Sequence, residues 1–375
     1  MTDTSRALTM ELVLDTAINR GLIDGGVVTV GNSSGILYST SRGSLFSGPS
    51  APPLDEHTAF DVASLTKVVA TAPAVLKLLE SGRISLTDPI TRWFPELEGT
   101  GREDVTILNL LTHTSGLHDV SLPTQTPLVS ALQKLAKQIS TTDSGSRFRY
   151  ADINFILLGE LVRRVTGQPF DRFCSETIYA PLGMQDTGFL PNDRPARLAL
   201  APTYGSGGET LVGAVQDENS RNMGGIAGHA GLFSTASDLA RFAMMIMNGG
   251  SGDSGRIYDA RSISQMTAPY FFSNGSVIRG LGWDIHSPFS SPRGNAFSDM
   301  SFGHTGYSGS SLWIDPHRDL FVILLTIRRD YHDTRQFNRL RSTISDIAVS
   351  STDPTGIPPL QELYAVSEQP ITLTH

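Results

Sequence analysis

The chain has 375 residues, of which 39% are hydrophobic and 18% are charged, a composition typical of a globular protein with a buried core. Its formal net charge of −8 argues against a nucleic-acid partner, and no apolar run reaches the length of a membrane span. The N-terminus lacks a charged segment followed by an apolar one, so no signal peptide is expected and a cytoplasmic location is predicted.

The N-terminal part is predicted to form a helix and then a hairpin. Glu11–Leu22 has the apolar spacing of a short amphipathic helix. Val27–Val30 and Gly35–Tyr38 are predicted strands joined by a four-residue turn. A longer helix is predicted over Ser64–Leu79, and Pro73 inside it is expected to kink it or to free a carbonyl.

The rest of the chain alternates helical runs with turns rich in Pro, Gly and Ser as far as about residue 222, and strands return near the C-terminus. A helix is predicted over Ala236–Met247 with Ser237 as its N-cap. Two strands, Ser311–Ile314 and Leu320–Ile327, and a helix at about Thr334–Val349 follow. Strands at both ends with helices between them predict an α+β fold with an antiparallel sheet made from both chain ends.

The tetrapeptide Ser64-Leu65-Thr66-Lys67 is the most informative motif. The chain has only four lysines, and Lys67 alone has a serine three residues before it. A lysine one helical turn from a serine can take up its proton when shielded from water, whereas an arginine cannot. A helix start would also direct the Ser64 N–H and the helix dipole toward an oxyanion. The alternative is a capping serine beside a lysine whose ammonium group reaches solvent.

Two further motifs follow along the chain. Tyr150-Ala151-Asp152 precedes an apolar helical run, and His304-Thr305-Gly306 precedes a predicted strand. In this order, the three motifs resemble those of the serine β-lactamase and penicillin-binding protein superfamily. The tyrosine of the second motif resembles the class C β-lactamase branch, which also holds D-Ala-D-Ala carboxypeptidases and esterases.

The resemblance extends from about Gly26 to about Thr326 and includes three other segments: Asp88-Pro89-Ile90, Leu110–Leu117 and Gly231–Leu239. It implies a β-lactamase/transpeptidase-like fold, in which an antiparallel sheet is flanked by helices and a mainly helical lobe is inserted. We expect a single catalytic domain over residues 1–350, with its α/β part in about 1–84 and 225–350 and the helical lobe in about 85–224. Residues 351–375 are expected to form a C-terminal tail.

The resemblance also implies roles for the motif residues. Ser64 would be the nucleophile, Lys67 and Tyr150 would move protons, and the backbone N–H groups of Ser64 and Tyr307 would hold the oxyanion. Lys67 lies among apolar residues, and burial there is expected to lower its pKa.

Thr305 and Gly306 would border the substrate, with Gly306 allowing its close approach. Asp152 departs from the asparagine commoner in this family, and an acid there should stabilise the charged form of Lys67. His304 replaces a lysine typical of β-lactamases, and an ordinary histidine is cationic only below about pH 6.5.

Other titratable residues are assigned structural roles. Asp217, Glu218 and His229 lie in or beside a glycine-rich stretch, but their spacing fits no standard zinc pattern, so no metal or organic cofactor is expected. His113 is expected to be a structural hydrogen-bonding residue, and Cys174, the single cysteine, a buried and inert thiol.

The predicted function is that of a serine hydrolase that acts through an acyl-enzyme on a small-molecule ester, amide or peptide. β-Lactamase activity and acyl transfer on the same scaffold remain as alternatives. A non-hydrolytic module, such as a penicillin-binding sensor or an inactive relative, is the alternative from another class. We expect no membrane partner, and His304 favours neutral esters over substrates that carry a carboxylate.

Overall fold

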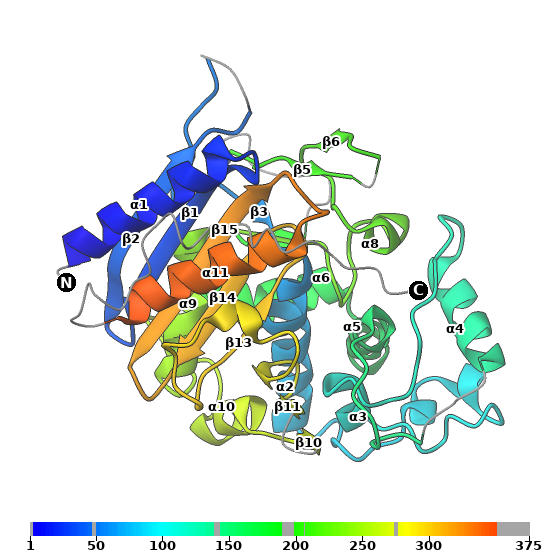
Figure 1. The fold of residues 1–375 in the computed structure, drawn as a ribbon. Coiled ribbons are helices and arrows are strands. Elements are labelled where there is room, and N and C mark those ends of the chain that lie inside the picture. The colour runs from blue at the N-terminus through cyan, green and yellow to red at the C-terminus, as the bar shows by residue number, and fades with distance from the viewer. Residues whose placement is uncertain are drawn as a thin grey trace, which may run out of the picture.

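The structure, a computed structural model, describes residues 3–46, 50–138, 143–189, 199–205, 207–273 and 277–350. The predicted tail over residues 351–375 lies outside the described residues. Figure 1 shows a twisted sheet with helices on both faces and a group of helices at one side. Among the described residues, no helix combines the length and apolar character needed to cross a lipid bilayer.

The large sheet of the described residues has eight antiparallel strands drawn from both ends of the chain. Its order is β10-β11-β12-β13-β14-β15-β1-β2. The bounds are β1 Ile23–Asn32, β2 Gly35–Gly43, β10 Phe271–Ser273, β11 Val277–Arg279, β12 Asp284–His286, β13 Phe302–Thr305, β14 Ser311–Asp315 and β15 Leu320–Arg328. The predicted N-terminal hairpin and the predicted pairing of the two C-terminal strands are both confirmed.

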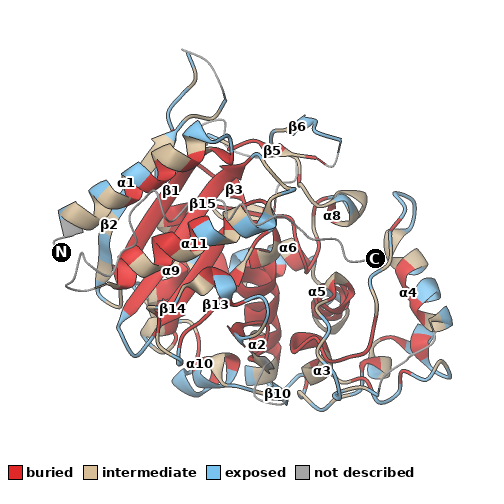
Figure 2. Cartoon of the chain, in the orientation of Figure 1, coloured by how far each residue is buried: buried red, intermediate tan, exposed pale blue. Residues whose placement is uncertain are grey.

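Side chains of the central strands alternate between two hydrophobic clusters, as the two-residue period of a strand requires. On β15, Ile323 and Leu325 face the larger cluster, whereas Val322 and Leu324 face the smaller one. Both faces are therefore buried, which Figure 2 shows as continuous red along the central strands. This double burial explains why β15 is almost entirely apolar instead of alternating with polar residues.

Helices cover both faces of the sheet. Helices α1 (Asp3–Asn19) and α11 (Thr334–Val349) pack together over one face, and α9 (Ala236–Met247) contacts β1 and β15 on the other. The remaining helices are α2 Ala72–Glu80, α3 Ile107–Leu111, α4 Pro127–Lys137, α5 Asp152–Thr166, α6 Phe170–Cys174, α7 Ala180–Leu182, α8 Glu218–Asn222 and α10 Ala260–Thr267. The domain boundaries near residues 85 and 224 stay a prediction.

Short strands complete the described structure. A three-stranded sheet has the order β3-β7-β4, with β3 Phe60–Asp61, β7 Leu232–Ser234 and β4 Gly188–Phe189. Two hairpins pair β5 Thr203–Tyr204 with β6 Thr210–Leu211, and β8 Ser251–Gly252 with β9 Gly255–Arg256. The pairing of β3 with β7 brings the chain before Ser64 beside the glycine-rich stretch.

Two predicted helix boundaries were wrong. Helix α1 begins at Asp3 and ends at Asn19, since residues on both sides of Glu11 complete a face that packs on the sheet. The N-cap of α9 is Thr235, whose hydroxyl accepts a hydrogen bond from the Asp238 N–H. Ser237 is also followed by helical residues, so the sequence pattern alone did not separate the two candidates.

The predicted helix from Ser64 to Leu79 consists of three successive helical forms. A 3₁₀ turn over Ala63–Leu65 is followed by a π-helical turn over Lys67–Thr71 and then by α2. Pro73 lies at the start of α2, where its missing N–H is tolerated, and the wide turn precedes it. The proline therefore marks a change of helical form and does not interrupt a regular α-helix.

Candidate active site

Ser64 lies on a strained turn that the neighbouring residues hold in place. Ala63 has a left-handed backbone with φ of 48°, a conformation that costs free energy in a residue with a side chain. The Asp61 carboxylate accepts hydrogen bonds from the Ala63 N–H at 2.8 Å and from the Gln216 N–H at 2.7 Å. Burial raises the pKa of Asp61 to about 6. Sequence reasoning missed this acid, although its place three residues before Ser64 could have indicated a capping role.

Lys67 is buried and its ammonium nitrogen has three oxygen neighbours. It donates to Ser64 Oγ at 3.0 Å and to the His229 carbonyl at 3.1 Å, and it lies 2.7 Å from Asp152 Oδ1. Burial alone lowers its pKa, but the opposing charge of Asp152 and the phenol of Tyr150 leave it raised overall. The expectation that burial would free the amine was therefore wrong, and the expected pairing with Asp152 is confirmed.

Tyr150 lies next to Lys67, half-buried in the wall of the site. The Lys67 nitrogen lies 5.0 Å from the centre of its ring. Burial raises the pKa of Tyr150, although Lys67 opposes the increase and hydrogen bonding of the phenol with Lys67 and Ser64 lowers it in part. At neutral pH the resting site thus holds a protonated lysine and a neutral phenol.

His113 supports Tyr150 from behind. The two rings stack with their centres 4.5 Å apart, and His113 Nδ1 accepts a hydrogen bond from the Ala151 N–H at 3.2 Å. Burial lowers the pKa of His113 well below its ordinary value, with the charges of Arg279 and Lys67 adding to the effect. His113 is a neutral, buried residue that orients the second motif, as the sequence predicted.

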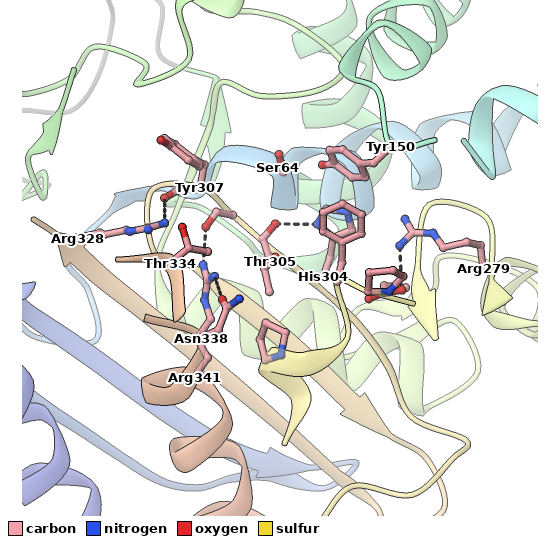
Figure 3. A pocket seen from close by; sticks show the side chains of 15 residues that line it. Ser64, Tyr150, Arg279, His304, Thr305, Tyr307, Arg328, Thr334, Asn338 and Arg341 are labelled. Atoms are coloured by element: carbon pink, nitrogen blue, oxygen red, sulfur yellow. Dashed lines mark hydrogen bonds and ion pairs between the residues drawn. The ribbon is translucent and has the colours of Figure 1, made fainter. Parts of the chain in front are cut away.

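The third motif begins at the end of β13, opposite Ser64 in the site (Figure 3). His304 is 5% exposed, and its Nδ1 donates to the Thr305 carbonyl at 2.9 Å, which leaves Nε2 without a proton in the neutral ring. Burial lowers the pKa of His304 well below 6.5, and Arg279 and Lys67 lower it further. Since a buried arginine on β11 contributes to this shift, the sequence could not have predicted its size.

Gly306 was expected to make room for the substrate; it lines the cavity and also allows close packing within the protein. A Cβ atom at this position would lie 2.1 Å from Ser310 Oγ and 2.4 Å from the Val62 carbonyl. Ser310 Oγ donates to that same carbonyl at 2.8 Å, and Ser308 Oγ donates to the Asp61 carbonyl at 2.6 Å. Gly306 thus lets the third motif pack directly on the turn that carries Ser64.

The glycine-rich stretch around residue 228 positions a carbonyl for Lys67. A Cβ on Gly228 would lie 2.0 Å from the Phe155 carbonyl, so only glycine allows the stretch to lie against α5. Thr71 Oγ1 fixes it further by donating to the Gly228 carbonyl at 2.5 Å. This close packing brings the His229 carbonyl within reach of the lysine.

Two of the three residues considered for a metal do lie together. His229 Nε2 is 2.8 Å from Asp217 Oδ1, and polar atoms of Asp152, Asp217 and His229 lie within 4.8 Å of one another. Burial alone would raise the pKa of Asp217, but His229 and the Ser220 N–H leave it lowered to about 2. The Lys67 ammonium group already faces Asp152, and Glu218 does not belong to this group of described residues.

These elements surround a cavity of about 390 Å³ that contains Ser64 (Figure 3). Part of its lining is apolar and includes Pro288, Phe289 and Pro292. The lining also includes polar and cationic residues: Arg328, Thr334, Asn338 and Arg341. Of the predicted site residues, Ser64, Tyr150, His304, Thr305, Gly306 and Tyr307 line the cavity, while Lys67 and Asp152 lie behind Ser64 and Tyr150.

Comparison with known proteins identifies relatives of the chain. A family model described as β-lactamase matches residues 14–343. Proteins named putative D-alanyl-D-alanine carboxypeptidase, from Salmonella agona and Salmonella enteritidis, are each 30% identical to this chain over an alignment of 304 residues, and the match covers 72% of this chain and 69% of each relative.

Solved structures share the fold at lower sequence identity. EstCE1, titled a hydrolase with promiscuous acyltransferase activity, is 22% identical and has a TM-score of 0.74, with 93% of this chain and 99% of that chain covered. A class C β-lactamase in complex with cefoxitin is 21% identical with a TM-score of 0.75, and the match covers 94% of this chain and all of that one (100%).

Proposed function

The chain belongs to the β-lactamase family and is a serine hydrolase, and from this premise we propose that it forms an acyl-enzyme on Ser64 and cleaves an ester or an amide bond. The main support for this proposal is the distance of 3.0 Å between Lys67 Nζ and Ser64 Oγ. Ser64 also lines a cavity that a small substrate can enter. A serine so close to a buried amine can lose its proton as it attacks a carbonyl.

Proton removal from Ser64 proceeds through Lys67 toward Asp152. Because Lys67 is protonated at rest, it can accept the serine proton only while it passes one of its own to a neighbour. The carboxylate oxygen Asp152 Oδ1 lies 2.7 Å from Lys67 Nζ, close enough to accept this proton. The lysine therefore keeps its charge as the Ser64 oxygen bonds to the carbonyl carbon, and the proton ends on Asp152.

Tyr150 then serves as the acid for the leaving group. Its phenol stays protonated at rest and faces the cavity beside Ser64, so it can donate to the departing oxygen or nitrogen. The protonated Asp152–Lys67 pair restores the phenol proton. Water subsequently hydrolyses the acyl-enzyme by the reverse sequence of proton transfers.

The oxyanion of the tetrahedral intermediate would be held by backbone N–H groups of Ser64 and Tyr307. Among the described residues, no backbone carbonyl accepts a hydrogen bond from the Tyr307 N–H, and Tyr307 lines the cavity. A donor that is left free and fixed by its backbone is suited to an oxyanion, because it needs no reorganisation during the reaction.

Neutral esters, amides and peptides are the favoured substrates. His304 is neutral at physiological pH, so the third motif does not offer the permanent cation that a lysine would. The apolar lining residues Pro288, Phe289 and Pro292 suit an apolar acyl group. Relatives named carboxypeptidases support the peptide alternative, whose C-terminal carboxylate a neutral His304 does not favour, and the fold shared with EstCE1 is compatible with an ester or with acyl transfer.

The test combines labelling with a substrate panel. A fluorophosphonate should add its mass to Ser64, and the Ser64→Ala variant should lose both labelling and activity. The panel consists of p-nitrophenyl esters, a D-Ala-D-Ala peptide and nitrocefin, and we expect turnover of the neutral esters to exceed that of nitrocefin. Labelling at another residue would show that Ser64 is not the nucleophile. Turnover of nitrocefin faster than that of the neutral esters would favour the β-lactamase alternative.

A further inference from the structure

Two buried arginines contact the backbone on either side of Tyr307, at the end of the third motif. Arg341 on α11 donates through Nη2 to the Gly306 carbonyl at 2.5 Å and to the Ser310 carbonyl at 2.9 Å. Arg328, at the end of β15, donates through Nη1 to the Tyr307 carbonyl at 3.2 Å. Figure 3 shows both side chains approaching this segment from the side away from Ser64.

The Gly306 carbonyl and the Tyr307 N–H belong to the same peptide group. A cation bound to the oxygen of a peptide group draws electron density toward that oxygen and makes the N–H at the other end a stronger donor. The Gly309 N–H also donates to the Gly306 carbonyl, at 3.1 Å, which fixes the plane of this peptide. Arg341 is therefore placed to strengthen and to aim the hydrogen bond that the Tyr307 N–H offers to the cavity.

Neither arginine forms an ion pair among the described residues, although the charge of Asp330 acts on Arg328 from further away. Within the described part of the chain, no carboxylate oxygen lies within 4.0 Å of either guanidinium group, although Arg328 and Arg341 are only 3% and 5% exposed. Burial and the charge of Arg328 both lower the pKa of Arg341. A buried, unpaired positive charge is costly to the fold, and its field extends further than that of a neutralised pair.

We propose that Arg341, assisted by Arg328, polarises and positions the Gly306–Tyr307 peptide as the oxyanion donor. This inference rests on the proposed acyl-enzyme mechanism and deepens it by adding a residue of the cavity lining that acts on the donor peptide. Arg341 is a positioning residue, because its effect reaches the oxyanion through the peptide group. Its contribution should be larger in the transition state than in the bound substrate, since only the transition state carries the negative oxygen.

The main test replaces Arg341 with Gln and follows hydrolysis of p-nitrophenyl butyrate. We expect kcat to fall by roughly tenfold to a hundredfold, somewhat less than the loss of a whole oxyanion donor, while KM changes by less than about threefold. Arg341→Lys, which keeps a cation that can reach a carbonyl, should recover most of the activity. A boronic acid that forms a tetrahedral adduct should bind more weakly to Arg341→Gln, in proportion to the loss in kcat/KM.

A matched control separates this role from a merely structural one. Arg102 is also buried and donates to a backbone carbonyl, that of Gln138, at 2.6 Å, but it does not line the active-site cavity. Arg102→Gln should lower the thermal stability much as Arg341→Gln does, with kcat and boronate affinity unchanged. If Arg341→Gln does not fold, Arg328→Gln supplies the test, with an expected loss in kcat of roughly threefold to tenfold because it acts one peptide further away.

The two proposals fail in different ways. If the fluorophosphonate does not label Ser64, the acyl-enzyme mechanism is wrong. If it labels Ser64 in every variant, but Arg341→Gln keeps the kcat and boronate affinity of the wild type, only the role of Arg341 is refuted. Equal losses in kcat for Arg341→Gln and Arg102→Gln would likewise refute it, since stability alone would explain both.

Discussion

The two sides of the active site handle positive charge in opposite ways. On the first side, which we call the proton-transfer side, Lys67 lies 2.7 Å from Asp152 and beside Tyr150. On the second, the oxyanion side, Arg328 and Arg341 have no carboxylate within 4.0 Å among the described residues, and His304 is kept neutral. The first side can exchange protons within a neutralised pair. The second keeps a fixed positive field where a negative oxygen is expected to form.

The largest expected effect comes from breaking the proton-transfer side. Lys67→Arg keeps the charge but cannot release a proton, so we expect turnover to fall by roughly a hundredfold or more. Lys77→Arg is the matched control, because Lys77 lies in α2 and donates to the Ile257 carbonyl away from the cavity. Steady-state kinetics on a neutral ester measures both. If the turnover of Lys67→Arg stayed within a fewfold of the wild-type value, Lys67 would contribute only its positive charge and would not transfer a proton.

Asp152→Asn tests whether the acid accepts the proton. We expect roughly a tenfold loss in kcat at pH 7, since the acceptor is removed. Asp152 raises the pKa of Lys67, so its removal lowers that pKa and populates the free amine as pH rises. The difference in kcat between Asp152→Asn and the wild type should therefore become smaller between about pH 7 and pH 9.

The control for this change is Asp119→Asn. Asp119 accepts a hydrogen bond from the Ile153 N–H at 2.9 Å and forms no ion pair with Lys67, so activity should stay within about threefold of wild type. A faster Asp152→Asn enzyme at pH 7 would contradict the relay. It would indicate that the free lysine is the base and that Asp152 restrains it.

Gly306→Ala tests how the two sides are held together. The added Cβ would clash with the Val62 carbonyl and Ser310 Oγ, so we expect a loss of about 1–3 kcal/mol in the free energy of unfolding. The distortion would also reach Ser64 through Val62, and kcat should fall. Gly188→Ala is the control because nothing lies within 4 Å of its added Cβ. Denaturant unfolding measures the free energy of unfolding of both variants. An unchanged value for Gly306→Ala would show that Gly306 packs less closely on Val62 and Ser310 than the structure indicates.

The smallest expected effect concerns His304 and pH. An ordinary histidine would gain charge near pH 6.5 and narrow the preference for neutral over carboxylate-bearing esters. Because the pKa of His304 lies well below that value, the ratio of the two kcat/KM values should change by less than about twofold between pH 8 and pH 5.5. His304→Lys should lower the ratio of kcat/KM for the neutral ester to kcat/KM for the carboxylate-bearing ester at every pH in this range. A marked fall in this ratio for the wild-type enzyme near pH 6 would show that the imidazole gains a proton there.

The superfamily and the fold could be predicted from the amino-acid sequence, and the comparisons and the structure confirm both. This was possible because the motifs are short and local: Ser64 and Lys67 are one helical turn apart, and Asp152 is two residues after Tyr150. Even the contact between Asp152 and Lys67 could be predicted, since an acid in the second motif must lie near the lysine of the first. The catalytic roles of these residues stay predictions until they are tested.

The electrostatics and the close packing of the site could not be predicted from the sequence, because they depend on how the chain folds. The net pKa direction of Lys67, the neutral state of His304 and the contact of Arg341 with Gly306 each depend on residues that are far away in the chain. Periodicity and motif spacing report on neighbours within a few residues, because a helix or strand repeats over that distance. A pKa or an oxyanion donor instead depends on every charge and backbone group that the fold brings within several ångströms.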